Sequence, residues 1–254
     1  MCYNLSFNED VESIHKYLPG VKAGQLDFDF KPSTYVSGFT YPTSPVVIWE
    51  NGEMVIKYMQ WGYMPAYAKG NVIDKDTNKQ RLLNTRTERI IDDPKSIWYR
   101  NRDKRVLVPA TGDFEHRHIS GVKGKKTVPY YIQLKERRYF FLLGLWTKSK
   151  IPDASGNYPD TFSISIRNAN PIMRAIHNGG DNPYRMPLVT PPTLESSWLN
   201  PDLSDQQMKL IFDYEISSEE LEYWSVKSLY KADRYDKTIL DPVTYEGEPP
   251  LEAA

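Results

Sequence analysis

Val106-Leu107-Val108-Pro109-Ala110-Thr111-Gly112-Asp113-Phe114-Glu115 runs from an apolar stretch through a turn sequence to a carboxylate. Its β-branched apolar residues predict a strand, and the Pro and Gly that follow predict a turn. Two interpretations of Glu115 remain open from the sequence alone. It is either a solvated surface residue or, if it is partly buried beside other groups, an acid–base catalyst with a raised pKa.

Strand patterns continue on both sides of this stretch. Asn51-Gly52 predicts a hairpin, because these two residues readily supply the positive φ angles of a type I′ turn. The other runs are β-branched, aromatic or alternating in polarity, which is typical of half-buried strands. The predicted strands are 46–49, 54–58, 105–109, 129–134, 139–145 and 161–166.

Predicted helices are few and short. Asn8 can cap a helix over 9–17, and Ser204-Asp205-Gln206-Gln207 fits a capping box that starts a helix ending at Asp213. Two further short helical segments are predicted at 86–91 and 168–176, and surface loops at 66–81 and 120–126.

Strands therefore outnumber helices, and they do not alternate as regular βαβ units. We expect the α+β class, with a curled, predominantly antiparallel, barrel-like sheet and peripheral helices. Residues 1–240 are expected to form one domain. The acidic, Pro-rich segment 241–254 is expected to be a loosely held tail.

Composition excludes several classes of protein. No stretch approaches the ~18 apolar residues that span a bilayer, and the N-terminus lacks the basic and apolar regions of a secretory signal. We therefore expect a cytoplasmic protein without a membrane partner. The single cysteine, Cys2, excludes a disulfide framework. His116 and His118 would share one face of a strand, but no third ligand is evident nearby, so we predict no metal site.

Charge is distributed unevenly along the chain, although the formal net charge is only −1. Residues 71–105 contain ten basic and six acidic side chains, whereas residues 193–254 contain fourteen acidic and five basic ones. Because nucleic-acid binding needs only one basic face, this distribution keeps a nucleic-acid partner open. The alternative is an ordinary solvated surface of mixed charge.

Cys2 is the first candidate for chemistry. A lone cysteine is usually an inert buried hydrophobe, but position 2 changes its prospects. Removal of Met1 is chemically plausible beside a small side chain, and it would place an α-amine next to the thiol. Such an aminothiol converts an aldehyde to an imine and then to a thiazolidine. It could equally attack an acyl carbon, as in amidohydrolases with a terminal nucleophile.

Two further polar motifs are candidates for the same site. His177 follows an apolar helical turn, where a histidine is more often structural than catalytic. Asn84-Thr85-Arg86 lies in the basic segment. The amide of Asn84 suits hydrogen bonding to backbone or substrate, and Arg86 suits a phosphate. A helix cap with a solvated arginine is the alternative.

Taken in order, six motifs resemble the SOS response-associated peptidase family, whose domain is called SRAP. Each motif is weak alone, but their order, with Cys at position 2, is specific, and the resemblance covers roughly residues 2–226. The motifs are Cys2, Trp61-Gly62-Tyr63-Met64-Pro65, Asn84-Thr85-Arg86-Thr87-Glu88, Leu107-Val108-Pro109-Ala110 through Phe114-Glu115, Gly144-Leu145-Trp146, and His177 followed by Arg185-Met186-Pro187.

The resemblance implies a single SRAP domain that binds single-stranded DNA, shields abasic sites and needs no cofactor. It implies that Cys2, exposed by self-removal of Met1, crosslinks to the ring-opened abasic sugar through a thiazolidine. Asn84 would hold the N-terminus and its adduct. Glu115 would move protons, and His177 would assist opening of the sugar and any strand cleavage. The residues that would shape the DNA surface are Trp61, Gly62, Arg86, Arg185, Met186 and Pro187.

Three departures from the family pattern accompany the resemblance. Tyr3 and Asn4 stand where members often have Gly and Arg, and His116 stands where they usually have Trp. Six residues, 179–184, separate His177-Asn178 from Arg185, and we expect them to form a loop over the edge of the site.

Two rival functions stay open beside the covalent abasic-site sensor. One is a thiol peptidase or amidohydrolase acting on other proteins, and the other is a non-covalent single-strand-binding module. When bound to DNA the protein is expected to be associated with the nucleoid. The sequence identifies no protein partner.

Overall fold

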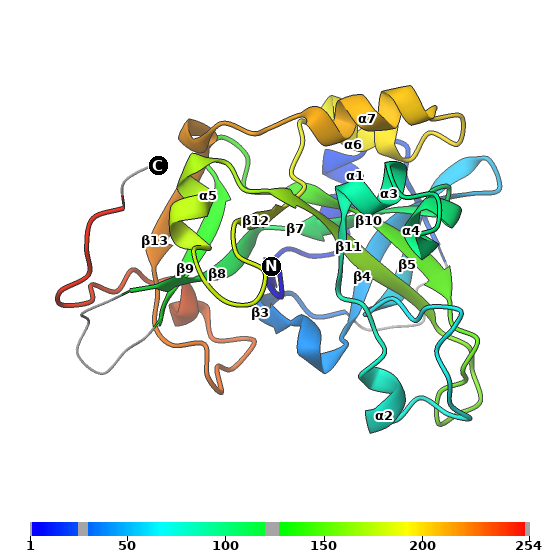
Figure 1. Cartoon of the computed structure of the whole chain (residues 1–254), viewed down its shortest axis with the longest axis horizontal. Helices are drawn as coiled ribbons and strands as arrows, with labels where there is room; N and C mark the ends of the chain where they lie inside the picture. The colour runs from blue at the N-terminus through cyan, green and yellow to red at the C-terminus, as the bar shows by residue number, and fades with distance from the viewer. Residues whose placement is uncertain (1, 25–29, 120–126, 252–254) are drawn as a thin grey trace.

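The computed structural model describes residues 2–24, 30–119 and 127–251, and Figure 1 shows their arrangement. Two sheets form the body of the molecule, and short helices lie at its periphery. The strands are β1 (Asn4–Phe7), β2 (Lys22–Ala23), β3 (Ser33–Ser37), β4 (Thr43–Glu50), β5 (Glu53–Trp61), β6 (Asn84–Arg86), β7 (Arg105–Ala110), β8 (Gly112–His118), β9 (Thr127–Leu134), β10 (Phe140–Lys148), β11 (Asp160–Asn168), β12 (Arg185–Pro187) and β13 (Leu221–Ser225). The α-helices are α1 (Ser13–Tyr17), α2 (Lys75–Asn78), α3 (Thr87–Ile91), α4 (Ile97–Arg100), α5 (Pro171–Ile176), α6 (Pro192–Trp198) and α7 (Asp205–Asp213).

The larger sheet closes on itself. Its strands follow the order β12-β11-β10-β7-β4-β5-β2, and β11 pairs again with β5, so that β4, β5, β7, β10 and β11 form a ring. The second sheet has the order β13-β9-β8-β1-β3 and is wholly antiparallel. The predicted α+β class with a curled, mostly antiparallel, barrel-like sheet is confirmed.

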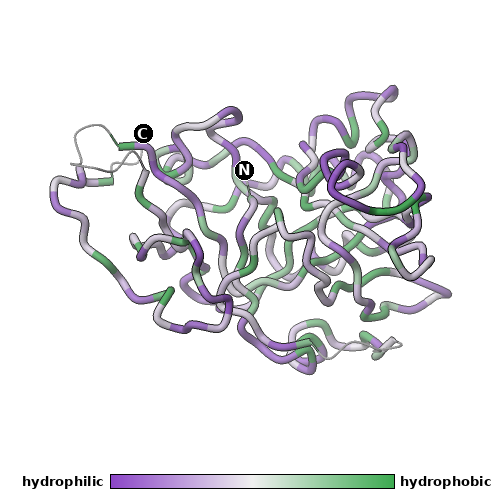
Figure 2. Tube along the Cα trace, turned by 90° about the horizontal axis from the view of Figure 1, so that it is seen from below, coloured by the Kyte–Doolittle hydropathy of each residue, from purple (hydrophilic) through white to green (hydrophobic). Residues whose placement is uncertain are grey.

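The strand that begins the opening stretch is buried on both faces. On β7, Val106 and Val108 belong to one core cluster, and Leu107 belongs to another that also contains Trp198 and Phe212 of α6 and α7. A strand covered on both faces needs apolar residues at every position, which explains the uninterrupted apolar run. In Figure 2 the more hydrophobic parts of the trace lie along the central strands, and many outer loops are hydrophilic.

Local sequence signals fixed several element ends. The hairpin between β4 and β5 is confirmed, with Asn51 at φ +52° and Gly52 at φ +86°. The capping box that starts α7 is also confirmed, because Ser204 accepts from the backbone of Gln207 and the Gln207 side chain accepts from the backbone of Ser204. The first helix is shorter than predicted. It starts at Ser13, because the Asn8 backbone N–H is still directed at the Thr111 hydroxyl beside β8.

The segment 66–81, expected to be a surface loop, is better ordered than predicted. Residues 66–81 contain α2, which starts with a capping box, and Arg81 is buried over the ring of Tyr41, with its guanidinium 4.8 Å from the ring centroid. The loop predicted at 120–126 lies outside the described residues.

The prediction of a loosely held tail is wrong for the described residues after Asp241. The Val243 N–H donates to the Ser225 carbonyl at 2.8 Å. Arg117, which is 8% exposed, donates to the carbonyls of Pro249 at 2.7 Å and Pro250 at 3.0 Å. A buried guanidinium needs acceptors, and the tail supplies them.

No helix within the described ranges is long and apolar enough to cross a membrane.

Candidate active site around Cys2

β1 carries the start of the chain into the middle of the molecule, as Figures 1 and 2 show. It runs antiparallel to β8, with Leu5 opposite Asp113. Cys2 precedes Leu5 by three residues, so the antiparallel register takes it along β8 toward Glu115. Its side chain is fully buried.

Asn84 fixes the backbone of Cys2. It opens β6, which runs parallel to β11 with Asn84 opposite Ile164. From there its side-chain Nδ2 donates to the Cys2 carbonyl oxygen at 2.8 Å. This hydrogen bond joins residues 82 positions apart, because β6, which pairs with the larger sheet, begins beside the N-terminal segment that leads into β1 of the smaller sheet.

Two carboxylates lie on one face of β8. Residues two apart on a strand share a face, and Asp113 and Glu115 are 3% and 4% exposed. Their neighbours across the ladder on β9 are Ile132 and Tyr130. Burial raises the pKa of both carboxyl groups, and the charge of Asp113 raises that of Glu115 further. Burial therefore favours the neutral carboxylic acid form of Glu115 in the folded protein.

The thiol of Cys2 shares this environment. Burial raises its pKa well above the ordinary value, and the negative charges of Asp113 and Glu115 add to the effect. Since the thiolate is the nucleophile, a neutral buried thiol needs a nearby base before it can react.

His177 completes the cluster from the end of α5. Its Nε2 lies 3.9 Å from Oε2 of Glu115, and its Nδ1 lies 2.9 Å from the Arg185 carbonyl oxygen. Burial lowers the pKa of His177 to about 4, so the imidazole is neutral at pH 7. Nδ1 can donate to the Arg185 carbonyl in one tautomer or accept from the Arg185 backbone N–H at 3.2 Å in the other. The first tautomer leaves Nε2 as an acceptor facing Glu115.

The site opens through a pocket with a volume of about 230 Å³. The loop 179–184 forms one side of it, as expected from the sequence. Gly179 packs against the imidazole of His118, where a Cβ atom would approach to 2.3 Å. Asn182 accepts a hydrogen bond from the Arg86 guanidinium, which ties the loop to β6. The lining residues are Tyr3, Glu115, His116, His118, His177, Gly179, Gly180, Asp181 and Asn182.

Four residues expected to shape the DNA surface are buried instead. Trp61 is 1% exposed, donates its indole N–H to the Leu83 carbonyl at 3.0 Å and stacks on Phe162. Its ring is not available for stacking on a base, so that interpretation is wrong. Gly62 packs under Tyr41 at φ +120°. Met186 and Pro187 line a small apolar cavity. These four residues are part of the packed interior rather than of an exposed DNA surface.

Arg86 and Arg185 lie at the surface end of the site. Arg86 is exposed, whereas Arg185 is half-buried and forms an ion pair with Glu88 at 2.7 Å. Arg185 therefore has a carboxylate partner with which any phosphate must compete.

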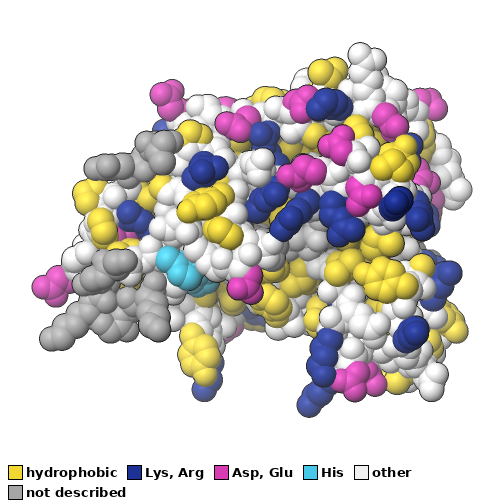
Figure 3. Space-filling view, in the orientation of Figure 1, with side chains coloured by type: hydrophobic (Ala, Val, Ile, Leu, Met, Phe, Trp, Pro, Cys, Tyr) yellow, Lys and Arg dark blue, Asp and Glu magenta, His cyan; other side chains and the backbone are white. Residues whose placement is uncertain are grey.

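A second, larger pocket begins where Asn84 holds Cys2. Its volume is about 470 Å³, and its lining includes three cations but no carboxylate. Figure 3 shows a band of Lys and Arg side chains across this face. Arg89, Lys95 and Tyr67 were not predicted from the sequence to line a site, although both cations belong to the basic segment 71–105. The lining residues are Tyr67, Leu82, Asn84, Thr85, Arg86, Arg89, Lys95, Ser96, Ile97, Trp98 and Ile166.

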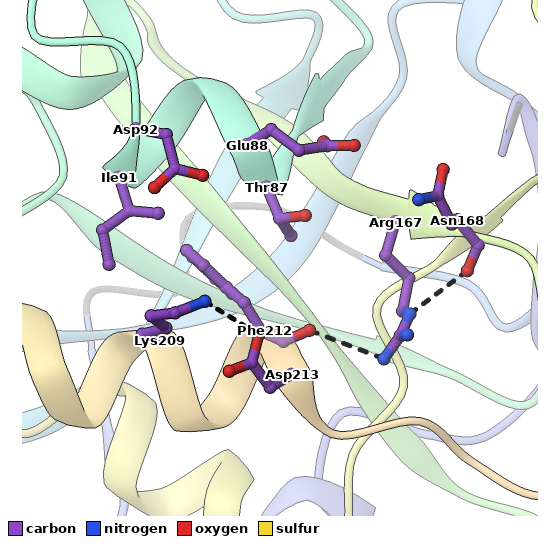
Figure 4. A pocket seen from close by; sticks show the side chains of 9 residues that line it. All are labelled: Thr87, Glu88, Ile91, Asp92, Arg167, Asn168, Lys209, Phe212 and Asp213. Atoms are coloured by element: carbon purple, nitrogen blue, oxygen red, sulfur yellow. Dashed lines mark hydrogen bonds and ion pairs between the residues drawn. The ribbon is translucent and has the colours of Figure 1, made fainter.

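The pocket in Figure 4 is a separate feature between α3, β11 and α7. Its volume is about 220 Å³, and its lining contains charged side chains of both signs. Lys209 pairs with Asp213 at 3.2 Å, and Arg167 donates to the Asn168 carbonyl at 3.1 Å. It contains none of the candidate catalytic residues. Within the described ranges, no group of three His, Cys, Asp or Glu side chains converges in a way that could hold a metal ion.

Comparisons with known proteins identify the family of this chain. Residues 1–231 match the family described as SOS response associated peptidase (SRAP). The chain is 27% identical to the abasic site processing protein YoqW of Bacillus subtilis over 171 residues, which cover 67% of this chain and 69% of that protein. It is 28% identical over 176 residues to the abasic site processing protein YMR114C of Saccharomyces cerevisiae, covering 68% of this chain and 41% of that one.

Solved structures share the fold. A protein from Bacteroides thetaiotaomicron superposes with a TM-score of 0.79 at 24% identity, covering 96% of this chain and all of that one. A protein from Bordetella bronchiseptica gives a TM-score of 0.69 at 18% identity, covering 89% of this chain and all of that one. The fold and the Cys2 site define an SRAP-type protein. This chain belongs to the SOS response associated peptidase family.

Proposed function

We propose that this protein processes abasic sites in DNA and does so covalently, through Cys2 after self-removal of Met1. The observation that carries the proposal is the hydrogen bond from Asn84 to the Cys2 carbonyl, which holds the start of the chain beside Glu115 and His177. The names of the relatives support a DNA substrate with abasic sites.

Sugar opening is assigned to Glu115 and His177. The neutral Nε2 of His177 accepts the proton of the C1′ hydroxyl while the C1′–O4′ bond breaks, and protonated Glu115 donates to O4′. The pair is well suited to this exchange, because the two groups lie 3.9 Å apart and their pKa values are shifted in opposite directions by burial. The proton then returns from His177 to Glu115.

Capture of the aldehyde follows at the aminothiol. The α-amine of Cys2 attacks C1′, water leaves and an imine forms. The sulfur then bonds to C1′ and closes the thiazolidine ring. Asn84 keeps the Cys2 backbone in place during both steps, so the two nucleophilic atoms meet the same carbon.

Single-stranded DNA is the proposed form of the substrate. The pocket that begins at Asn84 offers Arg86, Arg89 and Lys95 to phosphates and the exposed ring of Tyr67 to a base. Stacking on an aromatic ring contributes about 1–3 kcal/mol per base, and it requires an unpaired base. We further assign residues 1–240 to the SRAP domain and 241–254 to a C-terminal extension.

The test is incubation with an oligonucleotide that carries one abasic site, followed by heating and denaturing electrophoresis. A heat-stable adduct, with loss of Met1 in the intact mass, is expected for the wild type. Cys2→Ala retains the amine and should give only an imine that borohydride must trap. A complex that dissociates on denaturation would favour the non-covalent module, and peptide cleavage without any adduct would favour the thiol peptidase.

His177→Ala tests the sugar-opening step. It should slow reaction with a cyclic abasic site by about 10²-fold or more, but slow reaction with a simple open-chain aldehyde much less. His15→Ala, on the half-buried histidine of α1, is the matched control. Equal slowing with both aldehydes would remove the sugar role of His177.

A further inference from the structure

A second buried carboxylate lies beside Cys2, and the mechanism above does not use it. Asp113 precedes Glu115 by two residues on β8 and stands opposite Leu5 of β1 and Ile132 of β9. It is 3% exposed. The register therefore places Asp113 beneath the same N-terminal segment that carries Cys2.

The surroundings of Asp113 are apolar. It lines a small cavity of about 20 Å³, together with side chains from β9, β10, α5 and β12, among them Ile132, Phe140, Met173 and Met186. The titratable side chains of the described residues that interact with it are Cys2, Glu115 and Tyr131. No side chain in the described ranges forms a hydrogen bond of ordinary geometry with either carboxylate oxygen.

No Lys or Arg side chain in the described ranges forms an ion pair with Asp113 that would explain a buried carboxylate at this position. Arg117 lies two residues beyond Glu115 on the same face, but its guanidinium is bound to the carbonyls of Pro249 and Pro250 and lies 3.5 Å from Glu248. It therefore does not neutralise Asp113. A buried carboxylate that no described Lys or Arg side chain pairs with is costly to the fold, and such a cost is typical of a group retained for chemistry.

Asp113 and Glu115 serve different sides of the site. Glu115 lines the open pocket with His177, whereas Asp113 lines the small inner cavity and is absent from the open pocket. Asp113 acts on the thiol directly: after burial, its charge is the next cause of the raised pKa of Cys2, and the contact between thiol and carboxylate adds to it. Burial raises the pKa of Asp113 itself to about 7, where a carboxylate is an effective base near neutral pH.

We propose that Asp113 is a further catalytic residue, the base that takes the Cys2 thiol proton as the ring closes. This assignment rests on the proposed thiazolidine chemistry. Starting from the protonated imine, the thiol proton passes to the Asp113 carboxylate, the sulfur bonds to C1′, and the C=N electron pair returns to nitrogen. The products are a neutral thiazolidine and a neutral carboxylic acid, so charge and protons balance. In reversal, Asp113 returns the proton to sulfur as the C–S bond breaks.

Asp113→Asn separates ring closure from imine formation. With the abasic oligonucleotide, borohydride trapping reports the imine, and heat-stable adduct without reductant reports closure. The imine should form within about threefold of the wild-type rate, whereas closure should slow by at least tenfold, since acid–base assistance is worth about 10²–10⁴-fold. The pH dependence of closure between pH 6 and 8 should also flatten. Asp160→Asn, at a half-buried carboxylate with a raised pKa on β11, should leave both rates unchanged.

Wild-type closure rates in Asp113→Asn would overturn the assignment. A second variant, Asp113→Ala, must show the same separation, and its thermal melt checks that it is folded. Reaction of Cys2 with methyl methanethiosulfonate gives an arm that needs no DNA. There, Asp113→Asn should lower the apparent thiol pKa, and an unchanged pKa would refute the contact with the thiol. If the wild type forms no DNA adduct, the proposed function fails, and this thiol arm alone decides the role of Asp113.

Discussion

Glu115→Gln is expected to stabilise the fold at alkaline pH while it impairs the chemistry. The folded protein raises the pKa of Glu115 to about 8, chiefly through burial, whereas an unfolded glutamate titrates near about 4.3. A raised folded-state pKa gives stability that is fully present below about pH 4 and is lost as pH rises through about 8. Glutamine resembles the protonated acid and has no such dependence.

The magnitude follows from the shift. At pH 7.5 the unfolded glutamate has ionised by about three pKa units more than the folded one. At 1.36 kcal/mol per unit, this costs the wild type at most about 4 kcal/mol of unfolding free energy relative to the glutamine variant. Local relaxation in a protein interior reduces such penalties, so we expect the variant to gain about 2 kcal/mol in unfolding free energy at pH 8. At pH 5 the same calculation gives a ceiling of only about 1 kcal/mol, because the unfolded glutamate is then less than one pKa unit above its midpoint, so a much smaller difference is expected.

Denaturant unfolding at pH 5, 6.5 and 8 measures this difference, and intact mass establishes that both proteins have the same N-terminus. Glu222→Gln is the matched control, because that glutamate is exposed on β13 of the same sheet. Its difference from the wild type should not change with pH. If the Glu115→Gln and wild-type curves stay parallel from pH 5 to 8, the carboxyl group is not held protonated by burial, and the acid role assigned to it fails.

Three further outcomes are expected. Arg86→Ala should reduce the slope of log affinity for single-stranded DNA against log salt concentration by about 0.7, as for one lost phosphate contact, whereas Lys209→Ala on α7 should not; an unchanged slope places Arg86 outside the interface. Asn84→Ala removes the hydrogen bond to Cys2 and should slow crosslinking about 2- to 10-fold, the net worth of one hydrogen bond, with little change in the melting temperature. Truncation after Asp241 deprives buried Arg117 of its carbonyl acceptors, so differential scanning calorimetry should show a lower melting temperature; an unaltered melt would mean that the extension contributes nothing to the fold.

The elements predicted from sequence are those whose signals are local. Asn51-Gly52 requires positive φ at two successive residues, and a capping box requires only Ser204 and Gln207. The first helix was predicted too long because Asn8 is held by Thr111, a partner 103 positions away. Local propensity carries no information about such a contact.

The candidate site shows the same division. Cys2, Asn84, Glu115 and His177 were selected from motif order, and the fold places them around the start of the chain. Trp61 was misassigned to the DNA surface because an aromatic residue has the same sequence signal whether it stacks on a ligand or on Phe162. Asp113 could have been found from strand periodicity, since it shares a face of β8 with Glu115.

Burial of the thiol has a consequence for selectivity. With a raised pKa, Cys2 is almost entirely protonated at neutral pH, so it reacts slowly with oxidants and alkylating agents that meet it by collision. An aldehyde held as an imine on the adjacent nitrogen is different, because intramolecular reactions reach effective molarities of about 10⁵–10⁸ M. A neighbouring carboxylate then needs to remove the thiol proton only when the carbon is already in place. In the proposed mechanism, the same burial that weakens the thiol as a general nucleophile therefore reserves it for carbonyl groups captured by its own amine.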